Sequence, residues 1–119
     1  MTAPRKRNVA EDLRRYFAYR LPARVSEVEA ARDAARDAGW RDEPLRTFHR
    51  LAHSLAGVGA TFGFPEVSEA SRQLESLLKS SLDAGSPPDA AEVEDLLARL
   101  RDLAGTSPGA PGGRRRRPL

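Results

Sequence analysis

The chain has 119 residues, enough for one domain with its own core but not for two. It contains no cysteine, which excludes a disulfide framework, a cysteine nucleophile and thiolate-bound zinc or iron–sulfur sites. No segment approaches the roughly 20 consecutive apolar residues that a membrane span needs, and no signal peptide is recognised. We therefore expect a soluble, cytoplasmic protein.

The basic charge of the chain is concentrated at its two ends. The formal net charge is +3 and the sequence pI is about 9.9. Residues 5–7 and 114–117 hold seven of the 20 basic residues, so residues 8–104 carry 13 basic and 17 acidic residues, a charge of −4. Because the body is acidic, we do not expect a nucleic-acid partner. The Pro/Gly/Arg-rich stretch 105–119 is expected to be a disordered tail or a linker.

Apolar residues recur at helical spacing between glycine and proline breaks, and no period-two strand pattern is present. This pattern predicts an all-α antiparallel up-down four-helix bundle over residues 8–104, with a short N-terminal helix capping one end. Five helices are expected in chain order: residues 8–20, a second from Pro22 to Gly39, a third capped by Asp42 or Glu43 and running to about Gly63, a fourth from Pro65 to Gly85, and a fifth opening at Asp89.

The third expected helix has an unusual face around His53. Residues one and two turns before the histidine are cationic, whereas those one and two turns after it are small. From residue 44 to residue 64 the helix has no acidic residue, so its local field favours an anion at His53. Small side chains leave room for another protein to approach closely. The neighbours are Arg46, His49 and Arg50 on one side and Ala56, Gly57 and Ala60 on the other.

An exposed histidine with cationic neighbours can act as a phosphoryl acceptor. Neutral imidazole is a nitrogen nucleophile near pH 7, and phosphoryl transfer needs mainly positioning and charge stabilisation from the protein. A metal site formed by His49 and His53 is the other possibility. The helical zinc motif requires glutamate directly after the first histidine, where this chain has Arg50, and no third ligand is evident. We therefore expect no metal at this helix.

The residues AHSLAGVGATFGF, 52–64, resemble the signature of the histidine phosphotransfer (HPt) domain family of two-component phosphorelays. In that signature a hydrophobic residue stands two positions after the phosphorylated histidine, and Lys-Gly usually stands at the third and fourth positions. Leu55 and Gly57 match this pattern, whereas Ala56 replaces the lysine. The resemblance extends through the helical pattern from about residue 9 to residue 103.

The resemblance implies a signalling protein that carries a phosphoryl group on His53. The group would come from a histidine kinase or a receiver-domain aspartate and pass to another receiver aspartate. The chain would then be a carrier rather than an enzyme, with no cofactor of its own, and Mg²⁺ would belong to the partner receiver. We expect a monomer. No ATP-binding signature is present, so the phosphate must come from elsewhere.

The missing lysine leaves open which residue neutralises the phosphoryl charge. Arg50, one turn before the histidine, is the natural substitute. The full set of candidates is Arg50, Arg46 and His49 on the same helix and Arg72 and Gln73 on the next helix.

The partner-docking surface is expected to centre on the small residues after His53. Phe64 either joins this surface or packs against the start of the fourth helix. The docking candidates are Ala56, Gly57, Ala60 and Phe64. Two alternatives remain: a module that docks receivers or kinases without carrying phosphate, and a nucleic-acid-associated bundle that uses its basic ends.

Overall fold

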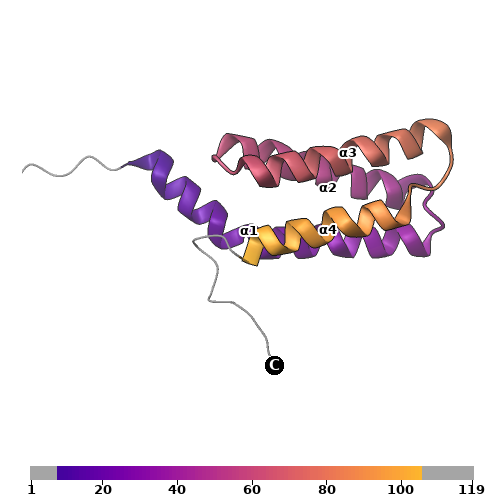
Figure 1. Ribbon diagram of the computed structural model, residues 1–119, viewed down its shortest axis with the longest axis horizontal. Coiled ribbons are helices and arrows are strands. Elements are labelled where there is room, and N and C mark those ends of the chain that lie inside the picture. The colour runs from indigo at the N-terminus through magenta and orange to yellow at the C-terminus, as the bar shows by residue number, and fades with distance from the viewer. Residues whose placement is uncertain (1–7, 106–119) are drawn as a thin grey trace, which may run out of the picture.

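The computed structural model describes residues 8–105, which form a bundle of four helices (Figure 1). Successive helices run in opposite directions, and α4 packs back against α1 to close the bundle. The predicted all-α antiparallel four-helix bundle is therefore confirmed. The expected disordered tail, apart from Gly105, lies outside the described residues. The helices are α1 (Val9–Asp37), α2 (Asp42–Thr61), α3 (Pro65–Ala84) and α4 (Ala90–Gly105).

The prediction of a separate short N-terminal helix is wrong, because α1 continues through Pro22 as one helix of 29 residues. A proline inside a helix removes one hydrogen bond and costs about 3 kcal/mol. Phe17 and Leu21 before Pro22, and Val25 after it, are all buried on one face of α1. Burial of each such side chain contributes about 1.5–3 kcal/mol, which outweighs the proline cost. Figure 1 shows α1 bending where its N-terminal part leaves the bundle.

Residues 9–16 of α1 are exposed and extend beyond the bundle, and α1 contacts the end of the bundle through Arg14 and Phe17. Phe17 lies against two aromatic rings at the turn between α2 and α3, with ring centroids 5.7 Å from Phe62 and 5.1 Å from Phe64. The guanidinium of Arg14 lies 4.7 Å from the centroid of the Phe64 ring. This aromatic cluster ties α1 to the α2–α3 turn.

Glycines in the left-handed region end two of the helices as predicted. Gly39, after α1, has φ 75° and Gly85, after α3, has φ 68°. The expectation that Asp42 or Glu43 caps α2 is wrong. The N-cap residue is Arg41, whose side chain has no acceptor atom and makes no capping bond.

The start of α4 follows the prediction. The Asp89 carboxylate accepts a hydrogen bond of 3.2 Å from the backbone N–H of Glu92, which satisfies one free donor of the first turn. None of the helices within residues 8–105 combines the length and apolar composition needed to cross a bilayer.

The core is formed by one apolar stripe from each helix, and its packing holds α2 rigidly in place. Large side chains that are fully buried come from all four helices. They include Leu21, Leu45, Phe48, Leu74, Leu78, Leu97 and Leu100.

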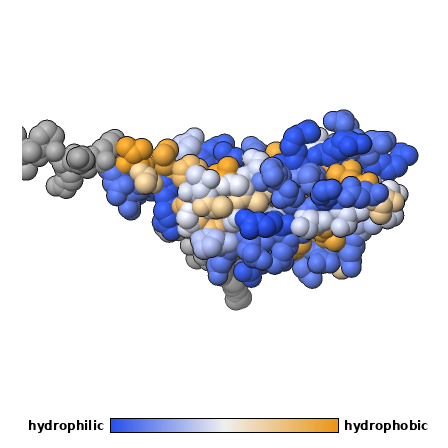
Figure 2. All heavy atoms as spheres, turned by 90° about the horizontal axis from the view of Figure 1, so that it is seen from above, coloured by the Kyte–Doolittle hydropathy of each residue, from blue (hydrophilic) through white to orange (hydrophobic). Residues whose placement is uncertain are grey.

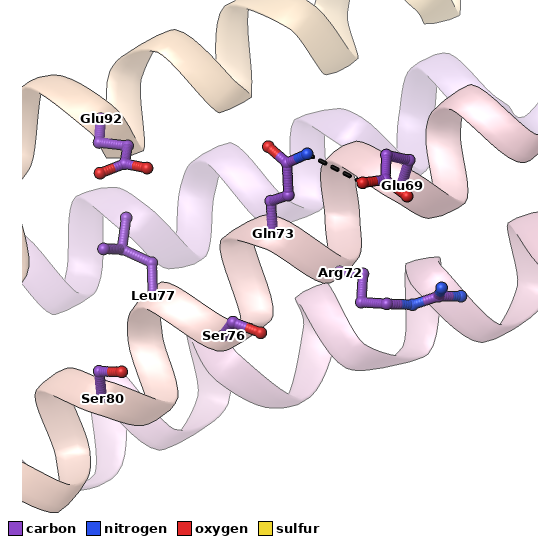
Figure 3. A pocket seen from close by; sticks show the side chains of 7 residues that line it. All are labelled: Glu69, Arg72, Gln73, Ser76, Leu77, Ser80 and Glu92. Atoms are coloured by element: carbon purple, nitrogen blue, oxygen red, sulfur yellow. Dashed lines mark hydrogen bonds between the residues drawn. The ribbon is translucent and has the colours of Figure 1, made fainter.

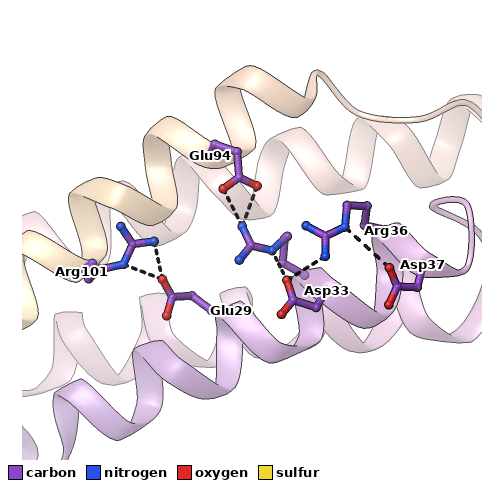
Figure 4. Close-up of polar contacts among 7 residues, drawn as sticks. Glu29, Asp33, Arg36, Asp37, Glu94 and Arg101 are labelled. Carbon is purple, nitrogen blue, oxygen red and sulfur yellow. Dashed lines mark hydrogen bonds and ion pairs between the residues drawn. The ribbon is translucent and has the colours of Figure 1, made fainter.

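A cluster of ion pairs joins α1 to α4 (Figure 4). The guanidinium of Arg32 on α1 lies 2.6 Å from the Glu94 carboxylate on α4 and 2.6 Å from its neighbour Asp33. The Arg32 side chain is only 13% exposed. Its desolvation acts to lower its pKa, but the hydrogen bonds to Glu94 and Asp33 outweigh this effect and raise the pKa above its ordinary value. A second pair, Arg101 with Glu29, links the same helices at 2.7 Å.

Replacing Arg32 by alanine is expected to lower the free energy of unfolding by about 1–2 kcal/mol, because charge-assisted bonds and a largely buried side chain are lost. The matched control is Arg36→Ala, since Arg36 is 52% exposed and, within residues 8–105, its ion pairs are with Asp33 and Asp37 on its own helix. That loss should stay below about 0.5 kcal/mol. Urea unfolding followed by circular dichroism measures both, and equal losses would contradict the inter-helix role of Arg32.

Candidate functional site

His53 lies in the middle of α2 on the surface of the bundle. Its side chain is 70% exposed, and the buried residues Phe48, Ala52 and Leu55 anchor the opposite face of the same helix in the core. The imidazole is therefore presented to solvent from a rigid support.

A carboxylate from α3 contacts this imidazole. His53 Nδ1 lies 2.6 Å from Glu75 Oε2, and the Glu75 side chain is 23% exposed. An ionised carboxylate can only accept a hydrogen bond, so Nδ1 carries the proton and donates it to Glu75. The lone pair of the neutral ring then lies on Nε2. The arrangement can use Nε2 as a nucleophile while Glu75 fixes the tautomer and the ring orientation.

Sequence reasoning missed Glu75 as a site residue. Residues 44–64 contain no acidic residue, but the interpretation of an acid-free surrounding is wrong for the site, because α3 brings a carboxylate against His53. One feature of the sequence could have indicated this contact. His53 and Glu75 are each eleven residues from Phe64, at the turn of an antiparallel helix pair, and such residues lie opposite each other.

His49 points toward the same carboxylate. Its Nε2 lies 3.9 Å from Glu75 Oε2, and the side chain is 25% exposed. The Nε2 atom is buried and has no hydrogen-bond partner. This ring therefore lies on the α3 side of α2, beneath the exposed surface around His53.

The two arginines that precede His53 on α2 contact residues on their own helix. The Arg50 guanidinium donates to Thr47 Oγ1 at 3.2 Å, and Arg46 Nε lies 3.9 Å from a Glu43 carboxylate oxygen. Both partners lie three residues earlier in the chain, so both contacts are directed toward the start of α2. Thr47 carries no charge, so the Arg50 charge is not neutralised by this contact.

On α3, Arg72 is linked to α2 through a buried serine. Its guanidinium donates to Ser68 Oγ at 2.9 Å, and Ser68 Oγ donates to the carbonyl oxygen of Ala56 at 2.9 Å. Arg72 is thereby connected to the residue that stands in place of the signature lysine. Gln73, by contrast, donates to Glu69 on its own helix at 3.0 Å.

The structure separates the four residues expected at the docking surface. Gly57 and Ala60 are exposed, and a Cβ added at Gly57 would meet nothing within 4 Å. The expectation that Ala56 lies on this surface is wrong: it is only 4% exposed, because its side of α2 faces α3. Phe64 is half-buried and packs against Phe17.

Gly59 is a further small residue on α2 and lies outside the expected docking set. A Cβ at Gly59 would lie 3.2 Å from the backbone nitrogen of Ser68 and 3.3 Å from Val67 Cγ1. Gly59 therefore allows a close approach of α2 to α3, a packing role rather than a docking role.

Two surface hollows lie on α3 and at the α2–α3 turn, and His53 is not among the residues that line them. One of about 520 Å³ runs along α3 and is lined by side chains such as Gln73, Ser76 and Leu77, with Glu92 from α4 (Figure 3). Another, of about 480 Å³, lies at the α2–α3 turn and is lined by Ala60 and Arg72 among others. His53 lines neither hollow, so its exposed ring is open to a protein partner rather than enclosed for a small molecule.

The surface seen from the α2–α3 side is mainly hydrophilic, with scattered apolar atoms (Figure 2). The exposed large hydrophobic side chains of the described residues all lie on the N-terminal part of α1. They are Val9, Leu13, Tyr16 and Tyr19. Within residues 8–105, no group of three or more histidine, cysteine, aspartate or glutamate side chains is placed to hold a metal ion.

Comparison with known families gives one clear match. The sequence model described as Hpt domain matches residues 12–103, which contain all of α2 and α3 and most of α1 and α4, and which lie within the predicted domain 8–104. Neither the comparison with curated proteins nor the comparison with solved structures gave a match. The chain therefore belongs to the Hpt domain family, whose members carry phosphoryl groups on histidine in phosphorelays with histidine kinases and receiver domains.

Proposed function

We propose that this protein is a monomeric, cytoplasmic phosphoryl carrier that uses His53. It accepts a phosphoryl group on Nε2 from a histidine kinase or a receiver aspartate and passes it to a receiver aspartate. The observation that carries this proposal is the 70% exposed imidazole whose Nδ1 lies 2.6 Å from Glu75. That contact occupies Nδ1 and leaves the lone pair of Nε2 available.

In the proposed transfer, the Nε2 lone pair of His53 attacks the phosphorus of a receiver's aspartyl phosphate. The N–P bond forms as the P–O bond to the aspartate breaks, and the aspartate leaves as a carboxylate with the bonding electrons. Nδ1 keeps its proton throughout, so the ring becomes positively charged. The reverse step returns the phosphoryl group to a receiver aspartate.

Glu75 has two roles in this mechanism. Its hydrogen bond holds the ring in one tautomer, and its negative charge balances the positive charge that develops on the imidazole. A hydrogen bond to a charged group contributes about 1.5–3 kcal/mol, which corresponds to roughly ten- to a hundredfold in rate if it is realised only in the transition state.

A cation is needed as well, because the phosphoryl group and Glu75 are both negative. We propose that Arg50 and Arg72 share this role in place of the missing lysine. Arg50 lies one turn before His53 on α2, and Arg72 lies one turn before Glu75 on α3. Hydroxyl groups hold both guanidiniums, so each can move to a phosphoryl group without breaking an ion pair to those partners. Mg²⁺ would be held by the receiver, and this chain would supply no cofactor.

His53→Gln is expected to abolish acid-labile labelling by a phosphorylated receiver, because the amide has no nucleophilic nitrogen. The variant should keep its helical content, since the side chain is exposed. Incubation with a ³²P-labelled receiver, followed by gel separation, measures the transfer.

The same experiment distinguishes a docking module that carries no phosphate. Such a module would bind the receiver in wild-type form and take no label. Undiminished labelling of the His53→Gln variant would show that another residue is the acceptor. Binding to nucleic acid, which the proposal does not include, can be checked with the same protein preparation.

The charge proposal predicts that Arg50→Ala and Arg72→Ala each slow phosphoryl transfer by about five- to tenfold, and that the double variant is slower still. Arg99→Ala on α4 is the matched control, since this exposed arginine lies on a helix that contributes neither His53 nor Glu75. Rates equal to the control would exclude both arginines from this role.

Gly57→Gln tests the docking surface. Replacing a mid-helix glycine that has free space around it should raise the free energy of unfolding by about 0.5–1 kcal/mol. The longer side chain should nevertheless slow transfer by about tenfold, because it obstructs the partner next to His53. Ala34→Gln, at an exposed position of α1, is the control and should transfer normally. A Gly57→Gln variant that is both more stable and fully active would contradict this docking surface.

A further inference from the structure

The buried nitrogen of His49 has no partner that explains its position. Its Nε2 is shielded from solvent and makes no hydrogen bond. A buried polar atom left unpaired costs about 1–3 kcal/mol, so such atoms call for an explanation. The Glu75 carboxylate oxygen Oε2 lies 3.9 Å away, and it is the same atom that His53 Nδ1 contacts at 2.6 Å.

We propose that His49 is a positioning residue that holds Glu75 against His53. In this arrangement His49 Nε2–H and His53 Nδ1–H both donate to one carboxylate, so two imidazoles of α2 and one glutamate of α3 act as a unit. The inference rests on the proposed function, since it concerns the glutamate that orients the phosphoryl-accepting ring. His49 thus acts through Glu75 and does not touch the phosphoryl group.

The geometry permits this shared contact. His49 and His53 are four residues apart, so they lie on the same side of α2 one turn apart, and Glu75 faces both. A carboxylate offers about four lone-pair positions, so it can accept from both rings. Shortening the His49 contact from 3.9 Å to the usual hydrogen-bond distance of about 3 Å needs only a small side-chain rotation.

Glu75 has a competing partner from which His49 would restrain it. Arg72 precedes Glu75 by one turn of α3, the spacing at which opposite charges attract. Arg72 instead bonds to Ser68. If Glu75 lost its contacts with the two histidines of α2, its side chain would gain rotamer freedom and could pair with Arg72. His53 would then lose the acceptor that fixes its tautomer.

Burial makes the inner contact the more durable of the two. The His53 side chain is 70% exposed, so water competes for its hydrogen bond, whereas the His49 side chain is 25% exposed and its Nε2 is fully shielded. A hydrogen bond to a carboxylate is stronger when water is excluded. In the proposal, His49 therefore holds the Glu75 carboxylate in place, and His53 donates its Nδ1 proton to that carboxylate.

The test is the tautomer of His53, read from imidazole ¹⁵N–¹H NMR spectra of the full chain at about pH 8, where an ordinary histidine is neutral. The wild type should show the proton of His53 on Nδ1. In His49→Phe, which keeps a ring of similar shape but has no donor, a large fraction of the proton should shift to Nε2. Phosphoryl transfer from a receiver should slow by about five- to tenfold. Glu75→Ala sets the reference for a lost acceptor, and Ser54→Ala, at an exposed neighbour on α2, is the unaffected control.

Two polar variants of His49 distinguish a role in positioning Glu75 from a role in packing alone. His49→Gln retains an N–H donor that can reach Glu75 and should keep the wild-type tautomer, whereas the shorter His49→Asn should lose it. These two polar variants also replace His49→Phe if the latter fails to fold. An unchanged His53 tautomer in both His49→Phe and His49→Asn would overturn the proposal. The NMR result does not depend on phosphorylation, so a protein that takes no phosphoryl group would refute the proposed function without deciding this inference.

Discussion

The close packing of α2 against α3 is the constraint on which the site depends. Gly59 lets the two helices approach so closely that a Cβ there would lie 3.2 Å from the Ser68 backbone nitrogen. Ser68 then bonds across the gap to the Ala56 carbonyl oxygen. Together these contacts set the register of the helix pair, and that register places Glu75 opposite His53. The chemistry of the imidazole is thus determined by packing at residues that do not touch it.

The same packing gives a physical reason for the missing lysine. Ala56 is 4% exposed and faces α3. A long charged side chain at this position would therefore be partly buried between α2 and α3, which costs free energy. A small residue allows Ser68 to reach the Ala56 carbonyl, and Ser68 in turn holds Arg72. Positive charge near the site is therefore carried by the neighbouring helix as well as by Arg50 on α2.

Local patterns predicted most of the fold, and contacts between helices account for the errors. The ends of α3 and the start of α4 followed from Pro65, Gly85 and Asp89, because these residues act within one turn. The sequence predicts a helix start at Pro22, but burial on both sides of it keeps α1 continuous. His53 was found from its own helix and signature. Glu75 was not, because no pattern within one helix reports what a second helix places beside it.

Ala56 differs from its predicted exposure for the same reason. A helical wheel centred on His53 gives the angle between residues but not the direction of the neighbouring helix. Ala56 and His49 turn toward α3, whereas Gly57 remains open to solvent. In the proposed mechanism the His53 imidazole therefore has two different sides, one facing α3 and one open to solvent. The α3 side holds Nδ1 through a carboxylate, which favours the positively charged phosphorylated ring. The open side leaves Nε2 to a partner, where Glu75 repels the phosphoryl group and nearby arginines attract it, and such opposing terms suit a carrier that must release what it accepts.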